Sequence, residues 1–212
     1  HEENPFDLIL LLGDYSLDHW KWNGGGSVIK DGISTTKTFV DDYVSQLPDV
    51  PLFILPGNHE QQGEENWFEM TGNYRNGIVL LGDTLFILPD TYGSDLDPNY
   101  NSDGTYTPVD TEWVKEMMDK YPNTDVYILA HYINQNQESE EFKELIANND
   151  RIKGMFMGHT HDGEVRILDE EWGNKTIAVT GNFSYYDGYS ALSANFWGFR
   201  ELVITQDAAY SQ

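Results

Sequence analysis

Four short polar motifs in this sequence each follow an apolar run of strand length. They are Gly13-Asp14, Gly57-Asn58-His59-Glu60, Ala130-His131 and Gly158-His159-Thr160-His161. In an open α/β sheet, ligands bind beyond the carboxyl ends of the strands, so we expect these segments to converge at one edge. They offer carboxylate, amide and imidazole donors, a mixture that suits Zn, Mn or Fe. The sequence therefore predicts a divalent metal site.

Asp14 is a strong candidate ligand because it follows the apolar run 6–12. An unpaired carboxylate at the end of a buried strand is costly, and a bound cation removes that cost. The alternative is an aspartate that caps the following turn. His131 has an alternative as well, that of a hydrogen-bonded histidine in the core.

The spacing of His159 and His161 requires a curled backbone. Two imidazoles at positions i and i+2 of an extended strand point to opposite sides. Both can therefore face a metal only if the loop bends, and Gly158 allows the close approach that such a bend requires.

The elements that must position these motifs follow from the hydrophobic pattern. Continuous apolar runs predict buried parallel strands, and helical spacing of apolar residues predicts the helices between them. We expect strands at 6–12, 51–55, 126–130 and 154–157, and helices at 34–47, 111–118 and 139–148. We also expect a hairpin of 77–81 with 85–88, and a second, antiparallel sheet from 165–168, 176–179 and 201–205. The strand at 6–12 should be central and covered on both faces.

The order of the motifs resembles the calcineurin-like metallophosphoesterases, whose signature runs Asp-x-His, Gly-Asp, Gly-Asn-His-Glu/Asp, a lone His after a strand, and Gly-His-x-His. Every element except the first is present, over about residues 6–203. The resemblance implies an α/β fold, a four-layer α/β/β/α sandwich of two mixed sheets. We expect one domain over 1–212 that begins after the first βα unit of the family.

The resemblance also implies a ligand set for two divalent ions, Zn, Mn or Fe. Asp14 would bridge the two ions, and Asn58, His131 and His159 would complete one site. His161 would help to hold the other, which the missing Asp-x-His leaves incomplete.

The implied reaction is phosphoester hydrolysis by a metal-activated hydroxide. His59 would protonate the leaving oxygen or steady the phosphoryl transition state, a task for a group that titrates near neutrality. Glu60 would orient His59.

Within the family, the chain is most similar to the acid sphingomyelinase-like phosphodiesterases. The likeness lies in Pro5-Phe6-Asp7, Asp18-His19-Trp20 and Gly198-Phe199-Arg200, and Leu17 stands where purple acid phosphatases carry a metal-binding tyrosine. Asp18 and His19 are therefore candidate substrate contacts, with a solvated loop as the alternative.

The basic residues favour a diester substrate. The chain has 12 of them, and no arginine cluster lies near the motifs to clamp a dianionic monoester. The alternatives are a phosphomonoesterase and a catalytically inactive binding module that retains the fold.

The composition limits the partners. A net charge of −24 excludes nucleic-acid binding through a basic patch, and an anionic substrate then needs local cations such as metal ions. The absence of cysteine excludes thiolate ligands and disulfides. No apolar run approaches the ~20 residues of a membrane span. We expect a monomer that acts on a small-molecule or lipid-headgroup phosphoester, located outside the cell or at its surface, with the cytoplasm as the alternative.

Overall fold

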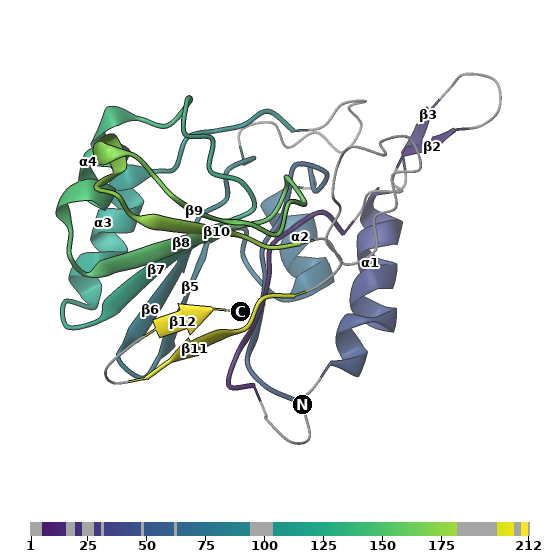
Figure 1. Ribbon diagram of the computed structural model, residues 1–212. Helices are drawn as coiled ribbons and strands as arrows, with labels where there is room; N and C mark the ends of the chain where they lie inside the picture. Colours follow the sequence, from purple (N-terminus) through teal and green to yellow (C-terminus); the bar gives the residue numbers. More distant parts are fainter. Residues whose placement is uncertain are drawn as a thin grey trace.

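The computed structural model describes residues 6–15, 20–22, 28–30, 32–47, 49–61, 63–93, 104–181, 199–205 and 209–211. Asp18 and His19 lie outside these residues. The described chain is an α/β fold in which helices cover mixed sheets (Figure 1).

The first part of the fold is a strand–helix–strand unit. Strand β1 (Ile9–Leu11) leads through the hairpin of β2 (Trp20–Trp22) and β3 (Val28–Lys30) to helix α1 (Gly32–Asp42) and the short 3₁₀ helix η2 (Val44–Gln46). Strand β4 (Leu52–Ile54) then pairs parallel to β1, with Leu10 opposite Phe53. The predicted parallel pair joined by a helix is confirmed.

A six-stranded mixed sheet forms the larger part of the fold. Its order is β5 (Gly77–Leu81), β6 (Thr84–Leu88), β7 (Asp125–Ala130), β8 (Ile152–Met157), β10 (Thr176–Val179) and β9 (Val165–Ile167). The four inner strands run parallel, and β5 and β9 are antiparallel edge strands. The predicted hairpin is β5–β6, and it turns at Gly82, whose φ of 56° suits glycine.

The predicted second antiparallel sheet is right in one pairing and wrong as a separate sheet. Strands β9 and β10 do pair antiparallel, but both belong to the large sheet. Strand β10 pairs parallel to β8, with Ala178 opposite Phe156, and β9 joins the same sheet beside β10. The physical reason is that Ile177, Ala178 and Val179 are all buried, so β10 has two covered faces and lies inside a sheet. Strand β11 (Leu202–Ile204) does pair antiparallel, with β12 (Ala209–Ser211).

Three further segments of the described chain are α-helices. Helix α2 (Glu64–Thr71) follows the Gly-Asn-His-Glu motif, and α3 (Thr111–Lys120) and α4 (Glu140–Asn148) precede β7 and β8. The side chains of Asp110 and Ser139 cap α3 and α4 by accepting hydrogen bonds from the backbone, as the sequence favours. Among the described residues, no helix is long and apolar enough to cross a bilayer.

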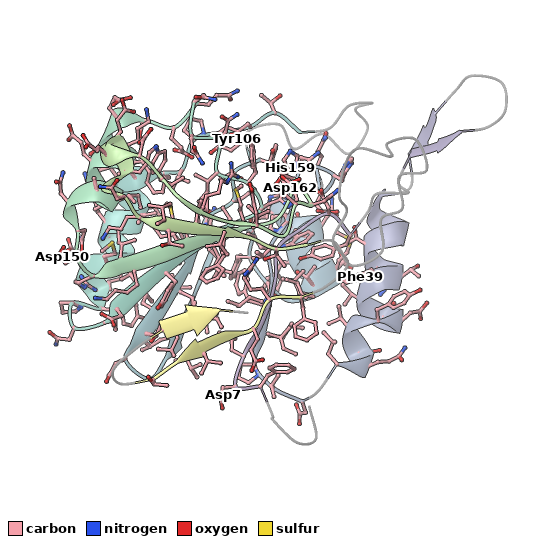
Figure 2. The ribbon with its side chains drawn as sticks, in the orientation of Figure 1. Asp7, Phe39, Tyr106, Asp150, His159 and Asp162 are labelled. Atoms are coloured by element: carbon pink, nitrogen blue, oxygen red, sulfur yellow. The ribbon has the colours of Figure 1, made fainter. Side chains whose placement is uncertain are left out.

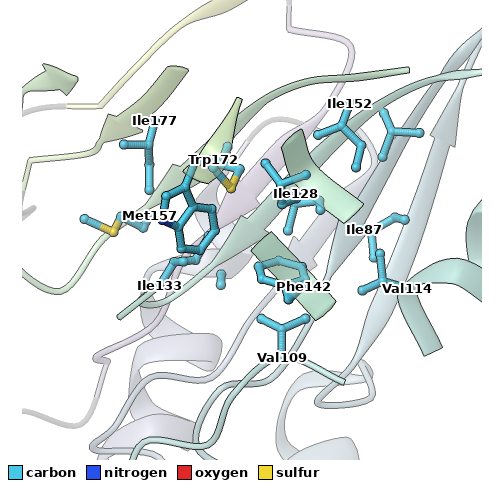
Figure 3. Packing of buried hydrophobic residues seen from close by; sticks show 14 of the residues in the cluster. Ile87, Val109, Val114, Ile128, Ile133, Phe142, Ile152, Met157, Trp172 and Ile177 are labelled. Carbon is cyan, nitrogen blue, oxygen red and sulfur yellow. The ribbon is translucent and has the colours of Figure 1, made fainter. Parts of the chain in front are cut away.

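Alternating side chains of the large sheet build two of the three apolar layers. Ile87, Ile128 and Met157 face α3 and α4, and Phe142 of α4 and Trp172 of the short 3₁₀ helix η3 (Glu170–Trp172) complete the cluster (Figure 3).

The opposite face of the large sheet packs against the β1–β4 pair. Phe86, Leu129 and Phe156 lie there against Phe53 and Leu55. A third cluster, which contains Ile54 and Trp67, joins the β1–β4 pair to α1 and α2. The layers are therefore helix, sheet, sheet and helix, as expected.

Strand β1 differs from its prediction as a strand covered on both faces. Leu10 contacts the cluster between the sheets and Leu11 the cluster beneath the helices, but all three residues of β1 are only half-buried. Within the described residues β1 pairs with β4 alone, which explains the remaining exposure.

Candidate metal centre

Four of the predicted ligands meet at the carboxyl ends of β1, β4, β7 and β8. The Nε2 atom of His131 lies 3.2 Å from Oδ2 of Asp14, 3.0 Å from Oδ1 of Asn58 and 3.1 Å from Nδ1 of His159. The Asn58 oxygen is also 3.1 Å from the His159 nitrogen. Figure 2 shows His159 where the strands run out into loops.

This spacing fits a shared cation. Ligand atoms that lie about 2.0–2.1 Å from one metal ion stand about 3.0–3.4 Å from one another. The chemistry of the donors agrees. Nδ1 of His131 lies 2.6 Å from the carbonyl oxygen of Leu12, which only accepts hydrogen bonds, so Nδ1 carries a hydrogen and Nε2 is the ring atom available to a metal. The residues present therefore fit a divalent metal ion.

The backbone is strained where the ligands lie. Among the described residues, Asp14, His159 and His161 have φ of 66°, 63° and 61°, values that side-chain-bearing residues rarely adopt. The predicted curl of the Gly158-His159-Thr160-His161 loop is confirmed. Such strain persists only where the surrounding structure imposes it, which is typical of binding sites.

Two glycines make the close approach possible. A Cβ atom on Gly57 would lie 2.3 Å from Oδ1 of Asp14, and one on Gly13 would lie 2.5 Å from Nδ1 of His131. No larger residue fits at either place without displacing a ligand.

Glu60 holds the turn that carries Asp14. Its carboxylate is fully buried and accepts hydrogen bonds from the N–H groups of Gly57 at 2.7 Å, Asp14 at 2.8 Å and Tyr15 at 2.9 Å. These bonds compensate its burial and fix the unusual backbone of Asp14. The expected orientation of His59 by Glu60 stays a prediction.

His59 and His161 lie near the four donors but outside their tight cluster. The backbone N–H of His59 donates to Oδ1 of Asp14 at 3.4 Å. Among the described residues, the acidic and imidazole groups close enough to share a metal are Asp14, His131 and His159, whose ligand atoms lie within 4.8 Å of one another. His161 remains a predicted ligand of a second ion.

Electrostatics prepares these groups for a cation at neutral pH. Burial raises the pKa of Asp14, but the charge and hydrogen bond of His131 outweigh it and hold the pKa at about 2. Burial and the charge of His131 lower the pKa of His159 to about 4, and burial also lowers the pKa of His161. Asp14 is then ionised and His159 neutral, the forms in which they bind metal.

The pKa of His131 shows that the centre stabilises positive charge. Burial lowers its pKa, but the carboxylate of Asp14 and the carbonyl of Leu12 raise it further than burial lowers it. The site therefore favours a positive charge at the place where a metal ion would bind.

Tyrosines that the sequence analysis did not single out wall the centre. The ring centroid of Tyr132 lies 4.6 Å from that of His159, and the ring centroid of Tyr92 lies 5.8 Å from that of His131. Tyr106 packs against Tyr132 at 5.7 Å, and its hydroxyl donates to Glu138. Of these three tyrosines, only Tyr132 could be associated with the site from the sequence, because it directly follows His131.

The fold and the four-donor site together define a metallophosphoesterase-type α/β protein. A model of the calcineurin-like phosphoesterase family matches residues 1–163, and the chain belongs to this family. The family implies divalent metal ions. The family resemblance seen in the sequence is thereby confirmed.

A distant relative adds a named activity. A probable glycerophosphodiester phosphodiesterase of Arcobacter nitrofigilis is 23% identical over 193 residues, which cover 82% of this chain and 62% of that protein. The chain thus spans about three-fifths of the length of this relative. Sphingomyelinase-like specificity stays a prediction.

Proposed function

We propose that the protein is a metal-dependent phosphodiesterase. The observation that carries this proposal is the convergence of four donor atoms at the ends of four strands, where Nε2 of His131 lies 3.0–3.2 Å from the donor atoms of Asp14, Asn58 and His159. Membership in a phosphoesterase family and a relative named as a phosphodiesterase support it.

Each residue of the centre has a definite task. Asp14, Asn58, His131 and His159 would hold an ion, and His161 would help to hold a second. When bound, such ions supply Lewis acidity, which lowers the pKa of coordinated water and polarises the phosphoryl oxygens.

The remaining groups serve the substrate. His59 stands beside Asp14 and would give its proton to the departing alkoxide. The tyrosine wall would exclude water from the ligands and so strengthen their electrostatic interactions.

The arginines support a diester over a monoester. Arg75 is ion-paired with Asp90, Arg166 is ion-paired with Glu164, and Arg151 and Arg200 donate to main-chain carbonyls. Bidentate arginine contacts favour a dianionic monoester, and these four arginines are committed elsewhere. We therefore favour a monoanionic diester.

Two classes of diester fit this choice. The likeness to sphingomyelinase-like enzymes, with Asp18 and His19 as substrate contacts, favours a phosphocholine lipid and a location outside the cell or at its surface. The name of the relative favours a glycerophosphodiester. Comparing the two substrates on one preparation decides between them.

The test is hydrolysis of bis-p-nitrophenyl phosphate and p-nitrophenyl phosphate by the full-length protein, loaded with Mn²⁺ or Zn²⁺ or stripped by a chelator. We expect metal-dependent turnover with the higher kcat/KM for the diester. His59→Ala should lower kcat by about 10²–10⁴ and leave metal binding intact. Absence of turnover with every divalent metal would overturn the proposal, and a preference for the monoester would overturn the substrate choice.

A second candidate is a catalytically inactive binding module. It is favoured by the place of His161, which is not among the described acidic and imidazole groups close enough to share one ion. Metal analysis separates the two candidates, because two bound ions per chain support the enzyme and one or none supports the module.

A further inference from the structure

A buried ion pair lies behind the metal centre, outside every sequence motif. Nε of Arg75, in the segment between α2 and β5, lies 2.7 Å from Oδ2 of Asp90, which follows β6. Their side chains are 1% and 2% exposed. The penalty of removing two charges from water can exceed the energy of their attraction, so a buried ion pair is weak evidence for stability. The pair of Arg75 and Asp90 therefore calls for another explanation.

Arg75 is connected to the Asp14 side of the centre through Glu60. Its Nη1 donates to the main-chain oxygen of Glu60 at 2.7 Å, and the Glu60 carboxylate holds the N–H groups of Gly57, Asp14 and Tyr15. The position of the Glu60 main chain therefore decides where Asp14 presents its carboxylate.

The aspartate reaches the other half. Oδ1 of Asp90 accepts from the N–H of Tyr92 at 2.9 Å, and the Tyr92 ring packs 5.8 Å from His131 and 6.2 Å from His159. One ion pair thus contacts the neighbours of the ligands on both sides of the site.

We infer that Arg75, held by Asp90, is a positioning residue of the metal centre, which aligns Asp14 through Glu60 and the two imidazoles through Tyr92. The inference rests on the metal site of the proposed function and needs no particular substrate. It extends the site to residues that do not touch the ion, and such outer contacts tune metal affinity.

Arginine suits this task where lysine does not. Its planar fork donates from Nε to Asp90 and from Nη1 to Glu60, two acceptors in different directions. A single ammonium group keeps the charge but cannot reproduce both bonds with the same geometry. Arg75→Lys therefore separates geometry from charge.

The experiment compares Arg75→Lys with Arg151→Lys in the full-length protein. Arg151 also bridges main-chain oxygens, those of Thr124 and Met118, but it precedes β8 at the end of the sheet away from the ligands. Figure 2 labels its neighbour Asp150 far from His159. The measurements are Mn²⁺ affinity by calorimetry, the visible spectrum of the Co²⁺-loaded protein as a report on ligand geometry, and urea unfolding.

We expect Arg75→Lys to weaken Mn²⁺ binding about 10- to 100-fold and to change the Co²⁺ spectrum. Arg151→Lys should lower the unfolding midpoint and change neither. If Arg75→Lys does not fold, Asp90→Asn keeps an oxygen for Tyr92 and should weaken binding in the same direction.

The inference is overturned if the variants at Arg75 and Asp90 lose stability but bind Mn²⁺ and Co²⁺ as the wild type does. A wild-type protein that binds metal and hydrolyses no phosphoester overturns the proposed function alone. A wild-type protein that binds no divalent ion overturns both.

Discussion

The two halves of the metal centre are held by different physical means. On one side, His131 directly follows β7, a strand in which Ile128 is 0% exposed. On the other side, Asp14 follows β1, whose three residues are half-buried, and its turn depends on hydrogen bonds that backbone N–H groups donate to Glu60.

The difference follows from how far each ligand lies from its strand. His131 is the first residue after β7, so close packing of the strand already positions it. Asp14 lies three residues beyond β1, with a backbone at φ 66°, and side-chain packing cannot impose such a turn. The buried carboxylate of Glu60 can impose this turn, because it accepts three hydrogen bonds from backbone N–H groups. Apolar packing thus positions ligands at strand ends, and polar networks position ligands on loops.

The largest effect on metal affinity is expected where the halves touch. In Gly57→Ala the added methyl group would meet Oδ1 of Asp14 at 2.3 Å and Cε1 of His131 at 2.9 Å. We expect Mn²⁺ affinity to fall about 100-fold or more, measured by calorimetry. Gly63→Ala is the matched control, since nothing lies within 4 Å of the added atom. Equal affinity in both variants would contradict the close approach.

A smaller loss of Mn²⁺ affinity is expected from Glu60→Gln, which tests the half of the centre that is held by hydrogen bonds. An amide offers one acceptor oxygen where the carboxylate offers two, and its NH₂ group would face backbone donors. We expect Mn²⁺ affinity to fall about 10-fold. Glu65→Gln, at an exposed position of α2, should leave the affinity unchanged. If Glu60 instead orients His59, the pH profile of kcat/KM will shift while metal affinity stays constant.

The smallest effect on affinity is expected from Ile128→Ala in the apolar half. Ile128 is fully buried, so a cavity should cost about 2–5 kcal/mol of unfolding free energy, measured with urea. The strand remains paired on both sides, and we expect Mn²⁺ affinity of the folded protein to stay within about threefold of the wild type. A loss as large as that of Glu60→Gln would remove the distinction between the two halves.

The hydrophobic pattern predicted much of the fold. The continuous apolar runs before Asp14, Asn58, His131 and His159 are parallel strands, as such runs predict, although β1 is only half-buried. The same logic failed for β10. The run of three buried residues in β10 is short. Its place in the sheet is decided by pairing with β8, a strand that is not adjacent to it in the sequence.

The sequence by itself determined which groups are the candidate ligands, since the type and order of Asp14, Asn58, His131 and His159 follow from local motifs at strand ends. Only the tertiary structure decided how they are held. Glu60 proved to fix the Asp14 turn, and the pair Arg75 and Asp90 proved to lie behind it. These contacts join segments 15 to 46 residues apart, and neither periodicity nor a local motif records which distant backbone groups a buried side chain will meet.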